Sequence, residues 1–454
     1  MEDVKSYFWP VAIKMNPQDN KPARPREPLD PAQLRLPEGM NFACHNSGRC
    51  CEDFWEIPVD EESLARLKSL PLSSLSPKFL DPEHYTEPGV GPKGGMALRR
   101  VGGRCIFLDP GRRCVIHHNF GATAKPQTCR DFPFRYICTP RGVFVGISMA
   151  CPSVRANRGR PLAEQHGELA DNYANALSIA TVTDPVELSA GLPIGFDAYE
   201  QIETCLNDLL ALETLSFDDR LIAGYVLLQI LDRTIRELGE PLDRAGANVI
   251  QLVQVLRQDG YRRAIAIARK ARGSARLHRA LIGLLLTYRS AFDDRQRGRL
   301  NRSAYLLYQY VRNMGGLGTL AMPPIEDRLS PSALRAVRAD WNDPYFVHMM
   351  ERFCCHSLFR KDAIVATPLL KGYAFLLVFV ALIRWYAAAY AASCHESEIG
   401  RAEIEEAVGA VEKYYCFHTD FMRLFDQYPL LSNTVERLLA KPVFAPSMLR
   451  PKGP

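Results

Sequence analysis

The chain has 454 residues, of which 47% are hydrophobic and 24% charged, and its formal net charge is +5. These are ordinary proportions for a globular protein, and the length is sufficient for two or three hydrophobic cores. The composition therefore excludes a small scaffold that needs disulfide bonds in order to fold.

Charge is distributed unevenly along the chain. Residues 97–160 and residues 261–302 each contain twelve Lys or Arg against two Asp, so each segment carries +10. Because the whole chain carries +5, the remaining residues carry −15. Two basic segments thus stand in an otherwise acidic protein, and they favour an anionic partner or a nearby negative centre.

Residues 1–40 are predicted to form a flexible N-terminal arm, because the stretch "NPQDNKPARPREPLDPAQ" is polar and rich in Pro. No basic and apolar pattern of the secretory type occurs there. We therefore expect a cytoplasmic protein.

Residues 41–160 are predicted to form a cysteine-rich, metal-binding module of short strands and loops. Eight of the thirteen cysteines of the chain fall between residues 44 and 151. In a reducing compartment such a density favours metal binding over disulfide bonds. The stretches "RRVGGRC", "LDPGRRC" and "YICTPRGVF" predict three tight turns between strands.

A tetrahedral zinc ion or an iron-sulfur cluster needs about four ligands, usually thiolates from separate loops. Cys50 and Cys51 are adjacent, and side chains of adjacent residues point apart on an extended chain. We therefore expect them to serve two sites, or one of them to pack. If Leu108 pairs with Arg113 across the second turn, Cys114 lies close to Cys105.

Other residues of this module have two alternative roles. His117 is either a ligand or a packing residue, and Cys138 alternates with aromatic residues in a pattern typical of a half-buried strand. The arginines near the cysteines either offset the negative charge of a thiolate centre or form a solvated face. These arginines are Arg99, Arg100, Arg104, Arg112, Arg113 and Arg130.

Residues 161–454 are predicted to form an all-helical domain. Ser216 and Asp219 resemble a capping box at the start of one helix. The apolar run at 372–383 is shorter than a membrane span, so it predicts a buried core helix. Further helices are expected over 245–271, 275–290, 300–313, 344–359, 366–393 and 401–425. The cysteines of this part are predicted to be core residues, and they are Cys205, Cys354, Cys355, Cys394 and Cys416. The predicted fold class is α+β, mainly α: a small cysteine-rich head on a helical body.

Four blocks of the head carry a family resemblance. The stretch "CHNSGRCC" resembles the C-x-x-C-G-x-C-C signature of a family described as a zinc- or iron-chelating cysteine-cluster domain. "CIFLDPGRRCVIHHNFGATAKPQTCRDFPF" is similar to the second and third blocks of that family, and "SMACPS" to its closing Cys-Pro. The step after Cys114, together with the C-terminal helices, is similar to the flagellin lysine N-methylase branch.

This resemblance implies a cysteine-bound iron-sulfur cluster (4Fe-4S) or a zinc or iron ion. It also implies transfer of a methyl group from S-adenosylmethionine to lysine side chains of a protein such as flagellin. Ser47 stands where the family usually has a cysteine, so the site has lost a ligand or recruits Cys138 or His117. The ligands that the resemblance implies are Cys44, Cys50, Cys51, Cys105, Cys114, Cys129 and Cys151.

The sequence is compatible with three alternative functions. The first is a metal-dependent protein lysine methyltransferase, although no Gly-rich loop follows a predicted strand and no catalytic residue stands out. The second is a structural or redox-sensing metal module that binds a protein partner. The third, ranked last, is nucleic-acid binding through the basic segments.

Overall fold

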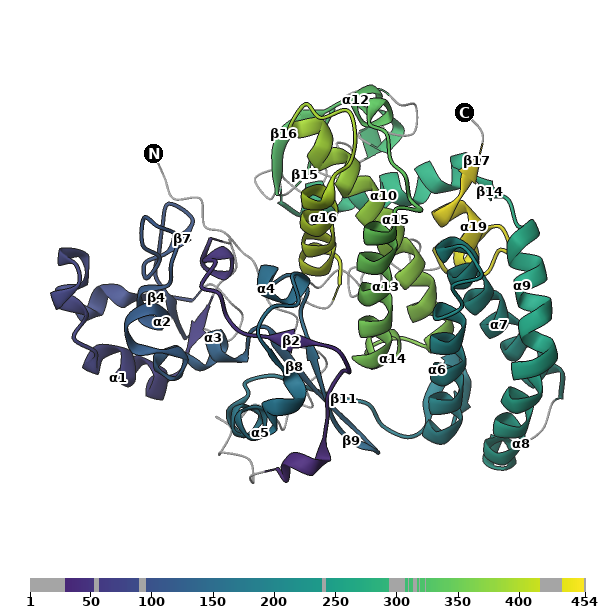
Figure 1. The fold of residues 1–454 in the computed structure, drawn as a ribbon, viewed down its shortest axis with the longest axis horizontal. Helices are drawn as coiled ribbons and strands as arrows, with labels where there is room; N and C mark the ends of the chain where they lie inside the picture. Colours follow the sequence, from purple (N-terminus) through teal and green to yellow (C-terminus); the bar gives the residue numbers. More distant parts are fainter. Residues whose placement is uncertain are drawn as a thin grey trace. The chain divides into compact units, whose positions relative to one another are not determined.

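The computed structural model describes residues 29–52, 57–89, 95–238, 242–293, 307–308, 310–312, 317, 319–322, 324–416 and 435–452. The fold is mixed α+β and mainly helical, with small sheets in the N-terminal half. The chain divides into two compact units between Thr181 and Val182 (Figure 1).

The N-terminal unit contains short helices and strands joined by 3-10 turns. Its α-helices are α1 (Glu61–Ser69), α2 (Val115–Phe120), α3 (Gln127–Asp131), α4 (Pro152–Arg155) and α5 (His166–Asn175). Its 3-10 turns are η2 (Pro31–Gln33), η3 (Arg49–Cys51), η4 (Leu72–Ser74), η5 (Pro77–Phe79), η6 (Pro82–Tyr85), η7 (Ala122–Ala124) and η8 (Leu162–Glu164). Its strands are β1 (Leu34–Arg35), β2 (Asn41–Phe42), β3 (Pro58–Val59), β4 (Thr86–Pro88), β5 (Met96–Leu98), β6 (Arg100–Val101), β7 (Arg104–Cys105), β8 (Phe134–Thr139), β9 (Gly142–Ile147), β10 (Arg160–Pro161) and β11 (Ile179–Thr181).

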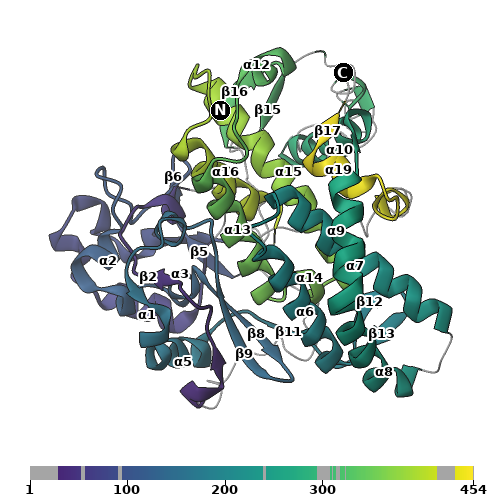
Figure 2. The ribbon, with the colours of Figure 1, turned by 45° about the vertical axis from the view of Figure 1, so that its right-hand side comes forward.

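The largest sheet of this unit has the strand order β1-β9-β8-β11. β8 and β9 form the hairpin that "YICTPRGVF" predicted, and they lie side by side in both ribbon views (Figures 1 and 2). Thr139 pairs with Gly142 across a two-residue turn. Gly142 has a φ of +113°, and a Cβ there would lie 2.6 Å from the carbonyl oxygen of Gln33, so this turn needs glycine.

The N-terminal unit extends beyond residue 160, where the sequence analysis ended the cysteine module. β11 pairs in parallel with β8, which makes it an edge strand of the main sheet. The Tyr136 hydroxyl on β8 donates a hydrogen bond to the carbonyl oxygen of Leu169 in α5. The sheet therefore requires residues 161–181, and a three-residue strand such as β11 leaves little periodic signal in a sequence.

The C-terminal unit is built mainly from helices. These are α6 (Phe196–Leu210), α7 (Phe217–Leu238), α8 (Leu242–Val255), the π-helix η9 (Leu256–Gly260), α9 (Tyr261–Lys270), α10 (Ala275–Asp293), α12 (Pro331–Ala336), α13 (Pro344–Phe359), α14 (Asp362–Val365), α15 (Leu369–Ser393), α16 (Arg401–Tyr414) and α19 (Phe444–Leu449). The unit is not purely helical as predicted, because three two-stranded sheets join its loops. Their strands are β12 (Val186–Ser189), β13 (Leu192–Ile194), β14 (Gly273–Ser274), β15 (Leu320–Met322), β16 (Ile325–Leu329) and β17 (Pro451–Lys452).

Helix α15 is the centre of this unit and packs against α7, α13, α14, α16 and α19. Within the described part of the chain it is the one helix long and apolar enough to cross a membrane. However, 78% of its most apolar window is buried inside the structure. The run at 372–383 lies within α15 and is buried throughout, as expected of a core helix.

The structure shows one half of the capping box expected at the start of α7. The Asp219 backbone N–H donates to Ser216 Oγ at 3.2 Å, and that hydroxyl donates to the Asp219 carboxylate at 2.7 Å. The predicted helix over 245–271 corresponds to α8, η9 and α9, in which a π turn joins two α-helices. The range predicted for α13 matches its bounds.

Several other predictions differ from the structure or lie outside it. The helix predicted over 401–425 ends at Tyr414 within the described residues. Most of the helix predicted over 300–313 and most of the N-terminal arm lie outside the described residues. Cys394 is exposed after the last turn of α15, so its prediction as a core residue is wrong.

Candidate metal centre

The first predicted turn of the cysteine module is confirmed. β6 and β7 pair in antiparallel fashion across Gly102 and Gly103, whose φ angles are +59° and +78°. Left-handed angles of this kind are what glycine provides in a two-residue hairpin turn. The hairpin places Cys105 in the interior of the N-terminal unit.

The second predicted turn forms, but its pairing differs from the expected one by one residue. Leu108 pairs with Cys114 and not with Arg113. Arg112 adopts the left-handed conformation, with a φ of 62°, and this lengthens the loop by one residue. Cys114 then stands directly before α2, at the N-cap of that helix.

The expectation that Cys50 and Cys51 point apart is wrong. Both residues belong to the 3-10 turn η3 and not to an extended strand, so the alternation of side chains does not apply. Their Sγ atoms lie 3.8 Å apart. The two thiols therefore face one common region.

Two residues with left-handed backbones fold the loop before η3. Asn46 has a φ of 55°, and its side-chain oxygen accepts a hydrogen bond from the Cys114 N–H at 2.9 Å. Gly48 has a φ of +72° and passes so close to the second turn that a Cβ would lie 2.1 Å from the carbonyl oxygen of Arg112. This close passage brings the Cys50–Cys51 doublet against Cys114.

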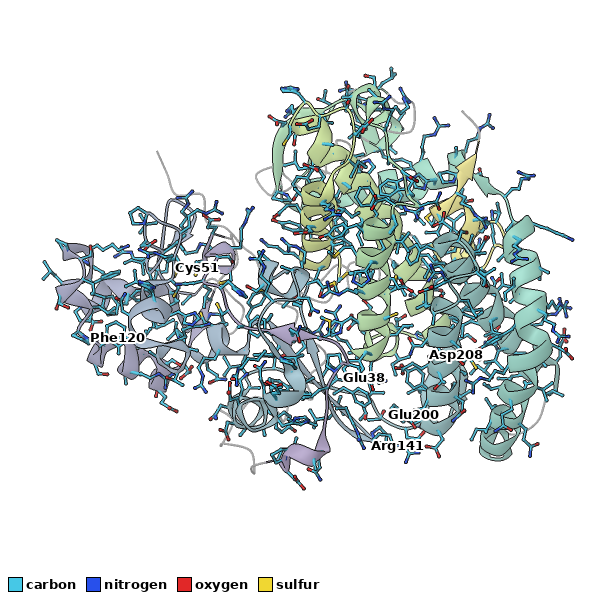
Figure 3. The ribbon with its side chains drawn as sticks, in the orientation of Figure 1. Glu38, Cys51, Phe120, Arg141, Glu200 and Asp208 are labelled. Carbon is cyan, nitrogen blue, oxygen red and sulfur yellow. The ribbon has the colours of Figure 1, made fainter. Side chains whose placement is uncertain are left out.

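Four cysteines form the centre of the candidate site, and we call them the sulfur quartet: Cys50, Cys51, Cys105 and Cys114. Cys51 is buried and labelled in Figure 3. Its thiol lies within hydrogen-bond reach of the sulfur atoms of the other three members. These sulfurs come from η3, from β7 and from the N-terminus of α2.

Three further cysteines adjoin the sulfur quartet. Cys129, on α3, interacts electrostatically with Cys50, Cys105 and Cys114. Cys44 interacts in the same way with Cys50 and Cys114. Cys151, at the N-cap of α4, interacts with Cys50 and Cys44. The structure thus gathers all seven cysteines that the sequence analysis named.

Within the quartet, the pKa of one thiol is raised and the pKa of another is lowered. Hydrogen bonding to Cys105 and to the other members raises the pKa of Cys51. The contact with Cys51, supported by the backbone N–H of His117, lowers the pKa of Cys114 to about 6. Cys114 therefore favours the thiolate at neutral pH, which is the form that binds metals.

The pKa values of two of the three adjoining thiols are raised, as that of Cys51 is. Burial raises the pKa of Cys129 and Cys151, whereas Cys44 is exposed. For Cys151 the backbone N–H groups of Ser153 and Val154, at the start of α4, oppose this rise. Cys129 and Cys151 are thus predominantly protonated at neutral pH in the absence of a metal.

Two of the six arginines named from the sequence pair with carboxylates. Arg112 forms an ion pair with Glu52, and Arg113 forms one with Asp109 at 3.1 Å. Arg100 does interact with Cys105 and Cys51.

The sequence analysis did not single out two lysines that are cations of the site. Lys78 donates hydrogen bonds to the carbonyl oxygens of Ile106 and Leu108, at 2.8 and 3.3 Å, and interacts with Cys105. Lys125 interacts with the thiols of Cys44, Cys50, Cys114 and Cys129. The sequence analysis weighed arginines near the cysteines and not lysines, although Lys125 lies within one of the quoted cysteine blocks.

Of the two residues considered as substitute ligands, Cys138 has its contact on another part of the unit. Cys138 is on β8, and its Sγ lies 3.5 Å from the Tyr173 hydroxyl. Burial lowers the pKa of His117 in α2, which is consistent with a neutral, half-buried imidazole. Ser47 is exposed. Substitution of a lost ligand by Cys138 thus has no support in this geometry.

The donor chemistry of the site fits a thiophilic metal, although the side chains are not arranged round an ion. Among the residues that the structure describes, no three Cys, His, Asp or Glu side chains surround a common point that could hold a metal ion. Yet a tetrahedral zinc with Zn–S bonds of about 2.3 Å has sulfur atoms about 3.8 Å apart, the separation found between Cys50 and Cys51. Seven thiols also exceed the four that one centre needs.

Comparison with known proteins gives no relative for this chain. No family model, curated protein or solved structure matches it. The chemistry of the cysteine site is therefore the main guide to what the protein does.

Proposed function

We propose that the N-terminal unit is a metal-binding head, and that it binds a zinc or iron ion or an iron-sulfur cluster through cysteine thiolates. One observation carries this proposal: seven cysteines from four separate stretches of the chain meet in one region together with Lys125. Hydrophobic packing alone would not require cations beside the thiols, because neutral thiols are small apolar groups.

Within this proposal the sulfur quartet holds the metal. Its members are in mutual contact through Cys51, and they come from loops that two left-handed residues hold together. A zinc ion bound there would stabilise the fold directly, whereas an iron-sulfur cluster would supply redox chemistry. Cys44, Cys129 and Cys151 then belong to a second centre or to the packing round the first.

We further propose that the whole protein is a metal-dependent protein lysine N-methyltransferase. Support comes from the resemblance of four blocks, from "CHNSGRCC" to "SMACPS", to the flagellin lysine N-methylase branch. S-adenosylmethionine would be the methyl donor, and a lysine-bearing protein such as flagellin the acceptor.

Calorimetry with S-adenosylmethionine tests the proposed enzyme. Metal-loaded protein should bind the donor measurably, and it should transfer labelled methyl groups to flagellin. A metal-loaded protein that neither binds the donor nor labels flagellin would leave the non-catalytic metal module as the function, and the metal proposal would stand.

Nucleic-acid binding remains a second candidate because of the outer face of α9. This helix turns Ala264 and Ala268 inward, while Ile267 is 42% exposed. Its exposed cations make no ion pair with a described residue, and they are Arg262, Arg263, Arg269 and Lys270. In Figure 1 α9 lies beside α7, with which it packs.

Measuring the affinity for DNA at increasing salt concentrations tests the nucleic-acid-binding function. A protein that neutralises phosphates loses affinity with a log-log slope of about −0.9 for each contact on duplex DNA. We expect weak, non-specific binding that disappears near physiological salt. Submicromolar binding that resists salt would instead promote the nucleic-acid function.

A further inference from the structure

The backbone N–H of Cys114 points away from the turn that precedes it. Cys114 takes part in an antiparallel bridge of that turn. On one side of the bridge the Asp109 N–H donates to the carbonyl oxygen of Arg113 at 2.9 Å. On the other side the Val115 N–H donates to the carbonyl oxygen of Phe107 at 2.8 Å. In such a pair the N–H of the bridged residue is directed outward, so the N–H of Cys114 needs an acceptor on another segment.

Asn46 supplies this acceptor. Its Oδ1 accepts a hydrogen bond from the Cys114 N–H at 2.9 Å. The φ of Asn46 is 55°, in the left-handed region, which Asn enters more readily than most residues because its short polar side chain bonds nearby groups. Asn46 therefore combines two properties: a left-handed backbone and a side-chain oxygen that binds the segment of Cys114.

A second contact fixes how the two segments pass each other. Gly48 lies so close to the second turn that a Cβ on it would overlap the carbonyl oxygen of Arg112. Asn46 is thus placed against Cys114, and Gly48 against Arg112. The two contacts lie two residues apart on each segment, so the segments run in opposite directions in a defined register.

This register decides which sulfur atoms can share a metal. The doublet begins two residues after Gly48, and its Sγ atoms lie 3.8 Å apart. A slip by one residue moves an extended segment by about 3.3 Å. That distance is close to the separation of two sulfurs round one zinc ion, about 3.8 Å. A one-residue slip between the segments would therefore carry the doublet out of reach of a metal held by Cys114.

We propose that Asn46 is a positioning residue, whose side-chain oxygen sets the register between residues 44–51 and Cys114 and so keeps the doublet and Cys114 close enough to bind one metal centre. This inference rests on the proposed metal-binding function. It assigns the role to the acceptor oxygen of Asn46, beyond the left-handed backbone that glycine could also provide.

Three variants of the full chain, purified without oxygen, separate these two properties. Asn46→Gly keeps the left-handed backbone accessible and removes the acceptor, whereas Asn46→Asp keeps both. Asn157→Gly is the matched control. Asn157 has a φ of 49°, and its Oδ1 accepts the N–H of Asn41 at 2.8 Å in the same unit. That bond involves no member of the sulfur quartet, and both glycine variants gain the same backbone freedom.

Two measurements are made on each protein. In the first, the protein is challenged with increasing EDTA, and the retained metal is measured by elemental analysis. In the second, metal-free protein is treated with diamide, which oxidises two neighbouring thiols to a disulfide and is itself reduced to the hydrazine. Mass spectrometry then follows the formation of disulfides between the doublet and Cys114. This second measurement needs no bound metal.

Removing a group that orients metal ligands typically weakens metal affinity about 10- to 100-fold. We expect this loss for Asn46→Gly, together with several-fold slower formation of the disulfides between the doublet and Cys114. Asn46→Asp should stay closer to the wild type in both measurements, because its carboxylate accepts the same hydrogen bond. Asn157→Gly should match the wild type in both.

Four results would overturn the inference. Asn46→Gly that retains metal and forms these disulfides like the wild type would show that the acceptor has no role. Asn46→Asp as impaired as Asn46→Gly would exclude the acceptor as the cause. Equal impairment of Asn157→Gly, or an Asn46→Gly variant that does not fold, would assign Asn46 to general stability. A wild-type protein without metal would refute the proposed function, while the disulfide measurement would still decide the role of Asn46.

Discussion

Gly48 stands where the loop carrying the cysteine doublet passes the turn before Cys114. Its φ is +72°, and a Cβ would lie 2.1 Å from the carbonyl oxygen of Arg112. Such a distance forces the two loops apart. Gly39 is a matched control, because its φ is +67° and no atom lies within 4 Å of a Cβ built there.

Gly48→Ala should separate the two loops and reduce the metal content of the purified protein several-fold. Gly39→Ala should cost only the strain of a left-handed residue, about 1–2 kcal/mol, and should retain the metal. Elemental analysis and urea unfolding of both variants measure the difference. Equal metal content in the two variants would show that the close passage at Gly48 does not hold the site together.

The cysteine doublet gives a second prediction at the level of single residues. Because the sulfurs of Cys50 and Cys51 lie 3.8 Å apart, we expect Cys50→Ser and Cys51→Ser both to lose metal. Cys138→Ser should retain it, since Cys138 contacts Tyr173 on another part of the unit. Metal analysis of the three variants checks this. Loss in only one doublet variant would restore the two roles that the sequence suggested.

The sequence identified the cysteines of the site but not its other members. Spacing and resemblance pointed to seven cysteines, and in the structure these seven lie in one region of the N-terminal unit. The alternation rule failed for Cys50 and Cys51, because it holds only for extended chain and the doublet lies in a 3-10 turn. Lys125 was not singled out although it lies within a quoted cysteine block, because only the fold shows which side chains are its neighbours.

At the level of elements, a buried ion pair joins α13 to α16 in the C-terminal unit. Arg360 follows α13 and is 1% exposed, and Glu412 in α16 is fully buried. The guanidinium of Arg360 donates to both carboxylate oxygens of Glu412, and also to Asp362. Removing one partner of such a pair leaves a buried charge with too little compensation.

Glu412→Gln should therefore destabilise the C-terminal unit by about 3–5 kcal/mol. Glu398→Gln is the control, because Glu398 pairs with Arg338 at the surface and should change the free energy of unfolding by less than about 1 kcal/mol. Urea denaturation followed by circular dichroism measures both. Similar stabilities of the two variants would mean that the buried pair contributes no more than a surface one.

Long, strongly periodic elements were predictable, and short ones were not. The start of α7 was located from Ser216 and Asp219, and α13 was predicted over its full range, because each helix buries a continuous apolar face. β11 and β14 have two or three residues and are defined by the strand that they pair with. For the same reason the expected register at Leu108 was wrong: the left-handed Arg112 cannot be read from its residue type.

At the level of the whole molecule, the two units have different sources of stability. The core of the C-terminal unit is formed by α15 and the helices round it. In the N-terminal unit, Cys51 and Cys105 belong to one hydrophobic cluster with Phe79, Tyr85 and Phe107. Metal-binding free energy in a cysteine-rich module contributes directly to folding. A strong chelator should therefore unfold the N-terminal unit first.

Hydrogen exchange followed by mass spectrometry tests this order of unfolding. After metal removal, peptides from residues 41–160 should lose protection while those from α7 and α15 keep theirs. Simultaneous loss of protection in both units would show that they unfold as one cooperative system.

The metal content of the wild-type chain, purified without oxygen, tests the central proposal most directly. Elemental analysis together with a visible absorption spectrum distinguishes zinc from iron and from an iron-sulfur cluster. We expect at least about one metal atom per chain, bound by four thiolates. A content well below one atom per chain, in protein that is folded and has reduced thiols, would contradict the proposal that these cysteines form a metal centre.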